Sequence, residues 1–230
     1  MLHLKGDSRD DIFGRAVREI GIMERAGVDA VVVEDYFGDK DDVRRVLEYL
    51  HREHQGGIRY GVNVLDEFAL SYELAAEHGA SFMQVDSVSG HLRVEDDPAY
   101  GEMIASYRGK GGVLVLGGVR FKYQPYLSGR TLEDDIRIGM GRCDVLVVTG
   151  DGTGMETSPC KIREFRKIAG GFPLFIGAGI TLESCAEQMR LGDGAIVGSF
   201  FKADGDARNE IDPERVKSFM DEVRRVRASG

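Results

Sequence analysis

Short apolar runs alternate with longer amphipathic segments along the chain, and this alternation constrains the fold more than any other feature. Eight runs are rich in branched or aromatic residues and end near glycine or polar residues, which predicts strands buried on both faces. The predicted strands cover residues 2–4, 30–34, 59–64, 82–86, 113–119, 145–149, 174–177 and 195–198. Helical periodicity between them predicts helices over residues 10–26, 41–54, 67–78, 97–108, 131–140, 159–169, 182–190 and 213–227.

Eight strands alternating with eight helices predict an α/β fold, a (β/α)8 TIM barrel that forms a single domain over residues 1–230. A doubly wound open sheet is the alternative. It is disfavoured because no G-x-G-x-x-G motif follows the first strand and the even series of βα units has no switch point. In a TIM barrel the loops that follow the strands form the active face, so strand ends supply the candidate functional residues.

Composition narrows the class of protein. The 39 acidic and 30 basic residues give a net charge of −9, and both signs are mixed along the helices, so no basic nucleic-acid surface is expected. The three cysteines form no C-x-x-C pair, which favours a reduced, cytoplasmic protein. No apolar run reaches the ~20 residues of a transmembrane segment. A homo-oligomer is the expectation for an enzyme of this size.

The stretch FIGAGITLESCAEQMRLGDGAIVGSFFK, residues 175–202, places glycines after the seventh and eighth predicted strands. The corresponding loops bind phosphate in many TIM barrels, because their backbone N–H groups can approach an anion closely. The alternative is that the glycines only make tight turns. The candidate phosphate-binding residues are Gly177, Gly179, Ile180, Gly198 and Ser199.

The ends of the earlier strands carry polar side chains. Glu34 and Asp86 are candidates for a general acid and base, or for Mg²⁺ ligands together with Asp35 or Asp151. Lys122 can form a Schiff base, can stabilise negative charge, or can be an ionic brace. His3 and Asn63 complete this rim.

The loop VVTGDGTG, residues 147–154, follows the sixth predicted strand. Its glycines can curl N–H groups around an anion or a ribose, and its threonine hydroxyls can add directional contacts. A glycine-rich turn after a strand is also common without any ligand. The candidates are Thr149, Gly150, Asp151, Gly152 and Thr153, with Asp151 assigned to catalysis and the others to binding. No metal site is predicted, since the His51 and His54 pair lacks a third ligand.

The segments VVVEDY (31–36), GVNVL (61–65), VTGDGTG (148–154), GAGIT (177–181) and VGSFFKADG…N…D (197–212) together resemble the BtpA family, also called the SgcQ group. The resemblance covers nearly the whole chain in order. It implies a TIM barrel in a family of which some members are linked to photosystem I biogenesis. Because the family also occurs in non-photosynthetic bacteria and archaea, the resemblance favours a metabolic enzyme over an assembly factor.

By the same resemblance, functional roles fall on one set of residues: His3, Glu34, Asn63, Lys122, Thr149, Gly150, Gly152, Thr153, Gly179, Gly198, Ser199 and Lys202. The chain departs from the family pattern in two places. HLKGDSRDD replaces a proline-rich first loop, which alters one wall of the mouth, and Glu34-Asp35-Tyr36 replaces Glu-Asn-Tyr. The added Asp35 charge favours a cation or an amino-bearing substrate.

These residues support an enzyme that holds a phosphorylated small metabolite, either a sugar phosphate or a nucleotide-like compound. Its reaction would be of the isomerase, lyase or glycosyl-transfer type, with a carboxylate that moves a proton and Lys122 that acts on the developing negative charge. Two alternatives remain open. One is a non-catalytic assembly factor that recruits a partner, and the other is an FMN-binding barrel that uses the same two phosphate loops.

Overall fold

A computed structural model describes residues 1–54 and 56–229. Its strands are β1 (Ala30–Glu34), β2 (Arg59–Asn63), β3 (Phe82–Ser89), β4 (Leu114–Val119), β5 (Val145–Val148), β6 (Leu174–Ile176) and β7 (Gly194–Ala195). Its α-helices are α1 (Arg9–Ala26), α2 (Lys40–Glu53), α3 (Phe68–Glu77), α4 (Asp97–Arg108), α5 (Leu132–Arg142), α6 (Pro159–Ala169), α7 (Leu182–Leu191) and α8 (Pro213–Ala228). Two 3₁₀ turns, η1 (Ser199–Phe201) and η2 (Ala203–Gly205), lie between β7 and α8.

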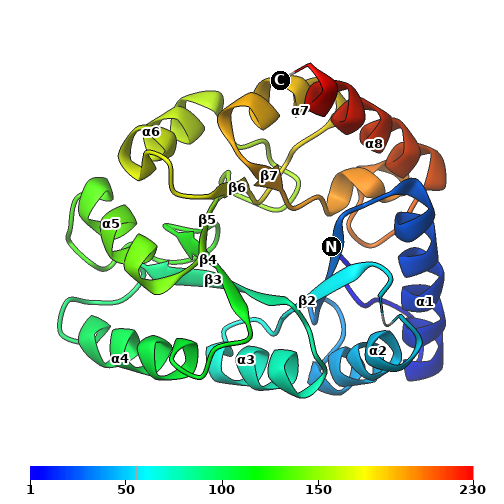
Figure 1. The fold of residues 1–230 in the computed structure, drawn as a ribbon, viewed down its shortest axis with the longest axis horizontal. Coiled ribbons are helices and arrows are strands. Elements are labelled where there is room, and N and C mark those ends of the chain that lie inside the picture. The colour runs from blue at the N-terminus through cyan, green and yellow to red at the C-terminus, as the bar shows by residue number, and fades with distance from the viewer. Residues whose placement is uncertain (55, 230) are drawn as a thin grey trace.

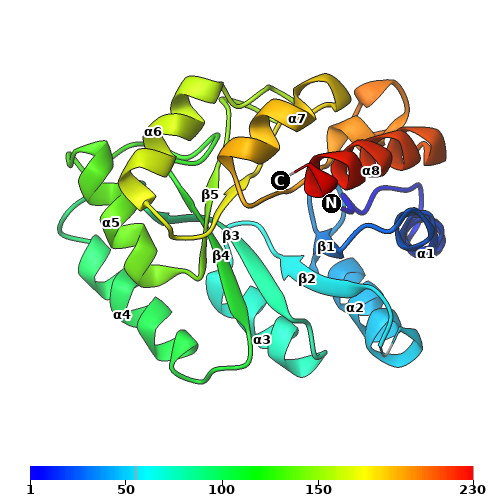
Figure 2. The same ribbon diagram turned by 45° about the horizontal axis from the view of Figure 1, so that its top comes forward.

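The strands form one parallel sheet in the order β1-β2-β3-β4-β5-β6-β7. Figure 1 shows the sheet curled around a central axis with the helices outside it, and Figure 2 shows α1 and α8 side by side where the ring of helices meets. Each strand pairs with the next along the chain, as right-handed βα units require. The predicted TIM-barrel fold is therefore confirmed.

The first and last predicted strands are shorter than expected. Leu2 makes a single parallel bridge with Val33, and the Met1 amino group donates to the Val197 carbonyl oxygen at 2.9 Å. The N-terminal residues therefore lie between the two edges of the sheet in place of a regular eighth strand. β7 ends at Ala195 because the backbone then turns at Gly198 (φ −115°, ψ −88°) into η1.

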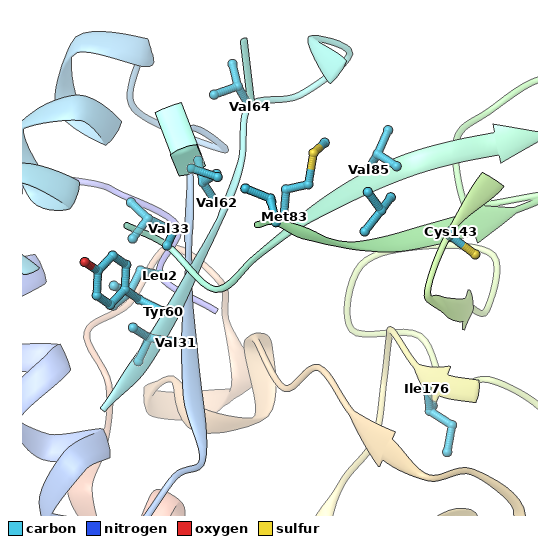
Figure 3. Close-up of a cluster of buried hydrophobic side chains, with 14 of the residues drawn as sticks. Leu2, Val31, Val33, Tyr60, Val62, Val64, Met83, Val85, Cys143 and Ile176 are labelled. Atoms are coloured by element: carbon cyan, nitrogen blue, oxygen red, sulfur yellow. The ribbon is translucent and has the colours of Figure 1, made fainter. Parts of the chain in front are cut away.

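The two faces of the sheet are buried by different groups. Outward side chains such as Val33 and Val62 pack beneath the helices, and Figure 3 shows part of this cluster. Inward side chains form a separate small core of Leu116, Phe121 and Val147 with Ile196. Among the described residues, no helix combines the length and the hydropathy that a bilayer span requires.

Two glycines make room for aromatic rings inside the barrel. A Cβ atom on Gly61 would overlap the Phe82 ring, and one on Gly194 would lie 2.6 Å from the Phe175 ring. Large rings on β3 and β6 thus face glycines on the neighbouring strands. Both rings line a cavity of about 490 Å³ at the amino ends of the strands, so this end of the barrel is not filled.

We expect Gly61→Ala to lower the free energy of unfolding by about 1–3 kcal/mol, since the added Cβ overlaps the Phe82 ring and forces it to move, and overpacking of this kind costs this much. Gly141→Ala is the matched control, because Gly141 lies in α5 and a Cβ there meets no atom within 4 Å. Alanine in a helix is favoured over glycine by up to about 1 kcal/mol, so the control should be neutral or stabilising. Urea unfolding measures both, and equal effects would contradict the packing argument.

Candidate active site

A cavity of about 240 Å³ opens at the carboxyl ends of the strands. We call it the mouth cavity. Side chains at the ends of β1, β3 and β4 line one side of it, and glycines that follow β6 and β7 line the other. Its polar lining includes His3, Glu34, Asp86, Lys122 and Thr153. The cavity therefore brings together residues that are far apart in the chain.

Two carboxylates share one amide in this cavity. The Asn63 Nδ2 donates to Glu34 Oε1 at 2.9 Å and to Asp86 Oδ1 at 3.4 Å. Carboxylates only accept when ionised, so the amide nitrogen must face both of them. Asn63 is buried beneath the cavity, and it holds the two acids at neighbouring positions.

The environment adjusts the acidity of both carboxyls. Burial raises the pKa of Glu34 to about 7, and the nearby Asp86 charge raises it further than the Lys122 charge lowers it. Burial also raises the pKa of Asp86. A carboxyl that titrates near neutral pH can both give and take a proton, so Glu34 is suited to general acid–base chemistry.

His3 contacts Glu34 as a neutral ring. Burial lowers the pKa of His3 to about 3, with the N-terminal amino group and Lys202 adding to the effect. Its Nδ1 lies 3.4 Å from the Ala207 carbonyl oxygen, which can only accept, so the proton sits on Nδ1. The unprotonated Nε2 is 3.7 Å from Glu34 Oε2. At neutral pH this contact is not an ion pair.

Lys122 is positioned by the loop after β5. Its Nζ donates to Thr153 Oγ1 at 3.0 Å, and its backbone N–H donates to Thr149 Oγ1 at 2.9 Å. The Tyr36 hydroxyl lies 3.2 Å from Thr153 Oγ1, and the Thr153 N–H donates to the Tyr123 hydroxyl at 2.8 Å. The two threonines thus fix an ammonium group at the edge of the mouth cavity.

An irregularity in β3 sets the position of Asp86. The register of the pairing between β3 and β4 shifts between Val85 and Ser89. Over this stretch β3 contains more residues than β4, as in a β-bulge. A Cβ on Gly118 would overlap the Asp86 carbonyl oxygen, so only glycine allows this approach. Bulges commonly redirect a side chain beside an active site.

A second hollow of about 120 Å³ adjoins the mouth cavity under the loops after β6 and β7. We call it the loop pocket. Gly179, Ile180, Gly198 and Ser199 line it, and no hydrogen bond from their backbone N–H groups to a described protein acceptor is present. Unpaired N–H groups at one place can bind an anion.

Charge and hydroxyl groups complete the loop pocket. Arg215, from the first turn of α8, lines it, donates from Nε to the Phe200 carbonyl at 2.6 Å and stacks on the Phe200 ring at 4.4 Å. Thr181, the N-cap of α7, also lines it. A guanidinium beside free amides favours a phosphate group.

Most of the predicted site residues are brought together by the structure. His3, Glu34, Asp86, Lys122, Thr153, Gly177, Gly179, Gly198 and Ser199 line the mouth cavity, and Ile180 lines the loop pocket. Asn63 and Thr149 are buried next to them and hold Glu34 and Lys122. The predicted clustering of these side chains at one rim is therefore observed.

Besides Asn63 and Thr149, four predicted site residues line neither hollow: Gly150, Asp151, Gly152 and Lys202. Asp151 is exposed on the loop after β5. Gly150 and Gly152 instead let this loop fold tightly, since a Cβ on Gly150 would lie 2.8 Å from the Met155 carbonyl oxygen. The three loop residues shape the turn that presents Thr153.

Lys202 forms a buried ion pair with Glu19 of α1. Its Nζ lies 2.9 and 2.8 Å from the two carboxylate oxygens of Glu19, which also accepts from the Ile211 N–H at 3.0 Å. Only 1% of Lys202 is exposed, so its ammonium cannot reach a ligand in either hollow. Its role in this structure is to tie the segment after β7 to α1.

The sequence analysis missed several lining residues: Tyr36, Gln84, Tyr123, Thr181 and Arg215. Gln84 could have been found from the alternation of β3, because it lies two positions before Asp86 and faces the same way. Arg215 carries no such signal, since it lies on a helix rather than at a strand end. Within residues 1–54 and 56–229, no group of three or more His, Cys, Asp or Glu side chains is placed to hold a metal ion.

A family model described as the BtpA family matches residues 3–225. An uncharacterized protein of Thermococcus kodakarensis is 26% identical over 253 residues, covering 100% of this chain and 95% of the relative. The putative sgc region protein SgcQ of Escherichia coli is 25% identical, covering 94% of this chain and 86% of the relative. The photosystem I biogenesis protein BtpA of Synechocystis sp. is 25% identical, covering 94% of this chain and 81% of the relative.

Solved structures share the fold at lower identity. A phosphoribosyl anthranilate isomerase from Thermococcus kodakaraensis superposes with a TM-score of 0.62 at 19% identity, covering 90% of this chain and 93% of that chain. A thiamine phosphate pyrophosphorylase from Pyrococcus furiosus superposes with a TM-score of 0.61 at 16% identity, covering 97% of this chain and 92% of that chain. These likenesses establish the barrel architecture.

The raised pKa of Glu34 predicts a pH-dependent stability. Between the ordinary value of 4.5 and about 7, the folded protein keeps a proton that the unfolded chain releases. The free energy of unfolding should therefore fall as pH rises through this window, by on the order of 3 kcal/mol from this group. Glu34→Gln should remove this loss. The free energy of unfolding of the variant, relative to that of the wild type, should therefore increase between pH 4 and pH 8.

Urea unfolding across this pH range measures the difference. Glu102→Gln is the control, because Glu102 is exposed on α4 and leaves the buried pair unchanged. A constant difference between Glu34→Gln and the wild type at every pH would show that Glu34 is not the group that burial perturbs.

Proposed function

This chain belongs to the BtpA family, and we propose that it is an enzyme that anchors a phosphorylated small metabolite in the loop pocket and transforms it in the mouth cavity. One observation carries the proposal. Arg215 and four residues whose backbone N–H groups have no described protein acceptor line a hollow that adjoins the cavity of Glu34, Asp86 and Lys122. A site that only braced the fold would pair those amides internally.

The chemistry follows from the charges. Phosphate bound in the loop pocket holds the rest of the substrate over the mouth cavity, which supplies the orientation that catalysis needs. Glu34, whose pKa is raised to about 7, moves a proton to or from the substrate at neutral pH. The Lys122 ammonium group stabilises negative charge that develops on a neighbouring oxygen.

These roles fit isomerisation, C–C or C–N bond cleavage, or glycosyl transfer on a sugar phosphate or a nucleotide-like compound. Two barrels of similar fold are named as enzymes of phosphorylated compounds, an isomerase and a pyrophosphorylase, which supports this class of substrate. The cytoplasmic location and the homo-oligomeric state expected from the sequence remain parts of the proposal.

A binding role is the second candidate, and an exposed apolar rim favours it. Tyr123, Tyr126, Leu127 and Met155 are each at least half exposed on the loops after β4 and β5. One relative is named a photosystem I biogenesis protein. If this chain acted only by recruiting a partner, replacement of Glu34 and Lys122 would leave its function unchanged.

The anchor is tested by thermal unfolding with sugar phosphates, nucleotides and FMN, each paired with its dephosphorylated form. A ligand at about 100 times its dissociation constant adds about 2.7 kcal/mol of stability. We expect phosphorylated members alone to stabilise the protein, and Arg215→Gln to weaken them at least about tenfold through the loss of a charged hydrogen bond. A yellow purified protein would instead identify the FMN-binding alternative.

The control for that experiment is Arg225→Gln, because Arg225 lies on the same helix but pairs with Glu222 at the surface. It should leave the stabilisation intact. Equal stabilisation by the phosphorylated and dephosphorylated forms would contradict a phosphate anchor.

Catalysis is tested with the compound that this panel identifies. Glu34→Gln should lower kcat by about 10²–10⁴-fold, the usual contribution of a general acid or base, while the stabilisation by the compound persists. Lys122→Met should also lower kcat. Borohydride treatment during turnover separates the two lysine roles, since a Schiff base leaves a covalent adduct on Lys122 and an electrostatic role leaves none. Unchanged turnover in both variants would contradict the assigned chemistry.

A further inference from the structure

A third hollow of about 220 Å³ adjoins the mouth cavity on the side away from the loop pocket. We call it the side cavity. Asp66, Asp86 and Gln124 line both the side cavity and the mouth cavity, so the two are adjacent. The side cavity lies under the loops after β2, β3 and β4, whereas the loop pocket lies under those after β6 and β7. The three hollows therefore lie next to one another across the barrel mouth, and we refer to them together as the cleft.

The two ends of this cleft have opposite electrostatic character. The loop pocket has Arg215 and unpaired N–H groups. The side cavity is lined by the carboxyl groups of Asp66 and Asp86, and its lining includes no lysine or arginine. An anion in the side cavity would face the like charges of Asp66 and Asp86 in the lining, which disfavours it. A neutral or cationic group would not meet this penalty.

The other lining groups of the side cavity are suited to hydrogen bonding with a neutral ring. His91 stacks edge to face on Tyr100 at 5.1 Å, and burial lowers the pKa of His91, which keeps the ring uncharged. Its Nδ1 is buried without a hydrogen-bond partner among the described residues. The Gln124 amide donates to Asp66 at 3.1 Å and keeps its carbonyl oxygen as an acceptor. His91 is partly exposed and lines the side cavity, so the accessible part of its ring can contact a ligand there.

We propose that the side cavity binds the non-phosphorylated end of the substrate, and that this end is a neutral or cationic hydrogen-bonding ring such as a nucleobase. The inference rests on the proposed function, because the phosphate in the loop pocket fixes which end reaches the side cavity. It narrows the proposed substrates to monophosphates whose phosphate binds in the loop pocket and whose other end binds in the side cavity. Compounds with phosphate at both ends are excluded by Asp66 and Asp86.

The test is calorimetric titration at constant ionic strength with four kinds of probe. These are inorganic phosphate, ribose 5-phosphate, the four ribonucleoside 5′-monophosphates and ribulose 1,5-bisphosphate. We expect at least one nucleoside monophosphate to bind ten times or more tighter than ribose 5-phosphate. The bisphosphate should bind no tighter than ribose 5-phosphate. A tighter bisphosphate would overturn the proposal.

Two variants locate the effect. His91→Phe keeps the ring on Tyr100 but removes its hydrogen bonds, so it should weaken the nucleoside monophosphate tenfold and leave inorganic phosphate unchanged. Asp66→Asn should strengthen the bisphosphate relative to the monophosphates. Asp96→Asn is the control, because Asp96 is exposed on the loop between β3 and α4, outside the side cavity. Equal weakening of every probe by His91→Phe would overturn a separate subsite.

The same titrations separate the two proposals. If inorganic phosphate and ribose 5-phosphate bind but no base adds affinity, the side cavity is not a base subsite and the phosphate anchor stands. If none of the probes binds to the wild-type protein, the proposed function fails, and this inference fails with it.

Discussion

A parallel sheet must be covered on both faces, and the rest of this structure depends on how the two faces are covered. Helices cover the outer face through residues such as Val33 and Val62. On the inner face Gly61 lies opposite Phe82 and Gly194 opposite Phe175, and these rings line a cavity at the amino ends of the strands. Phe121 and Ile196 lie highest in this inner core and line the floor of the mouth cavity. Above them the side chains are polar, so packing itself leaves a site at the carboxyl ends of the strands.

Burial then determines the chemistry of that site. Two carboxyls, Glu34 and Asp86, share the Asn63 amide in a partly dry cavity, and the pKa of each is raised because water is excluded. The charge of Lys122, whose ammonium group is held by Thr153, acts on both carboxyls. The cleft thus separates a carboxylate-rich end from an end that is rich in unpaired N–H groups. This separation gives a bound molecule one orientation.

The segment VGSFFKADG illustrates how a motif can serve a site without touching a ligand. Gly198 and Ser199 lie at the loop pocket, whereas Lys202 lies behind it in the ion pair with Glu19. Removing one partner of a buried ion pair leaves an uncompensated charge, which costs about 3–5 kcal/mol. The pair therefore holds η1 and the loop pocket in place from α1. A residue conspicuous in the sequence is here a positioning residue.

The sequence by itself determined the order of strands and helices, the barrel class and the rim that carries Glu34, Asn63, Asp86 and Lys122, because periodicity and strand ends are local properties. It could not place Lys202, Asp151 or Arg215. Lys202 and Asp151 follow strands as site residues do, yet one turns toward α1 and the other toward solvent. Arg215 reaches the loop pocket from α8. Contacts between segments far apart in the chain depend on how those segments pack, so only the tertiary structure decided which polar residues share the cleft.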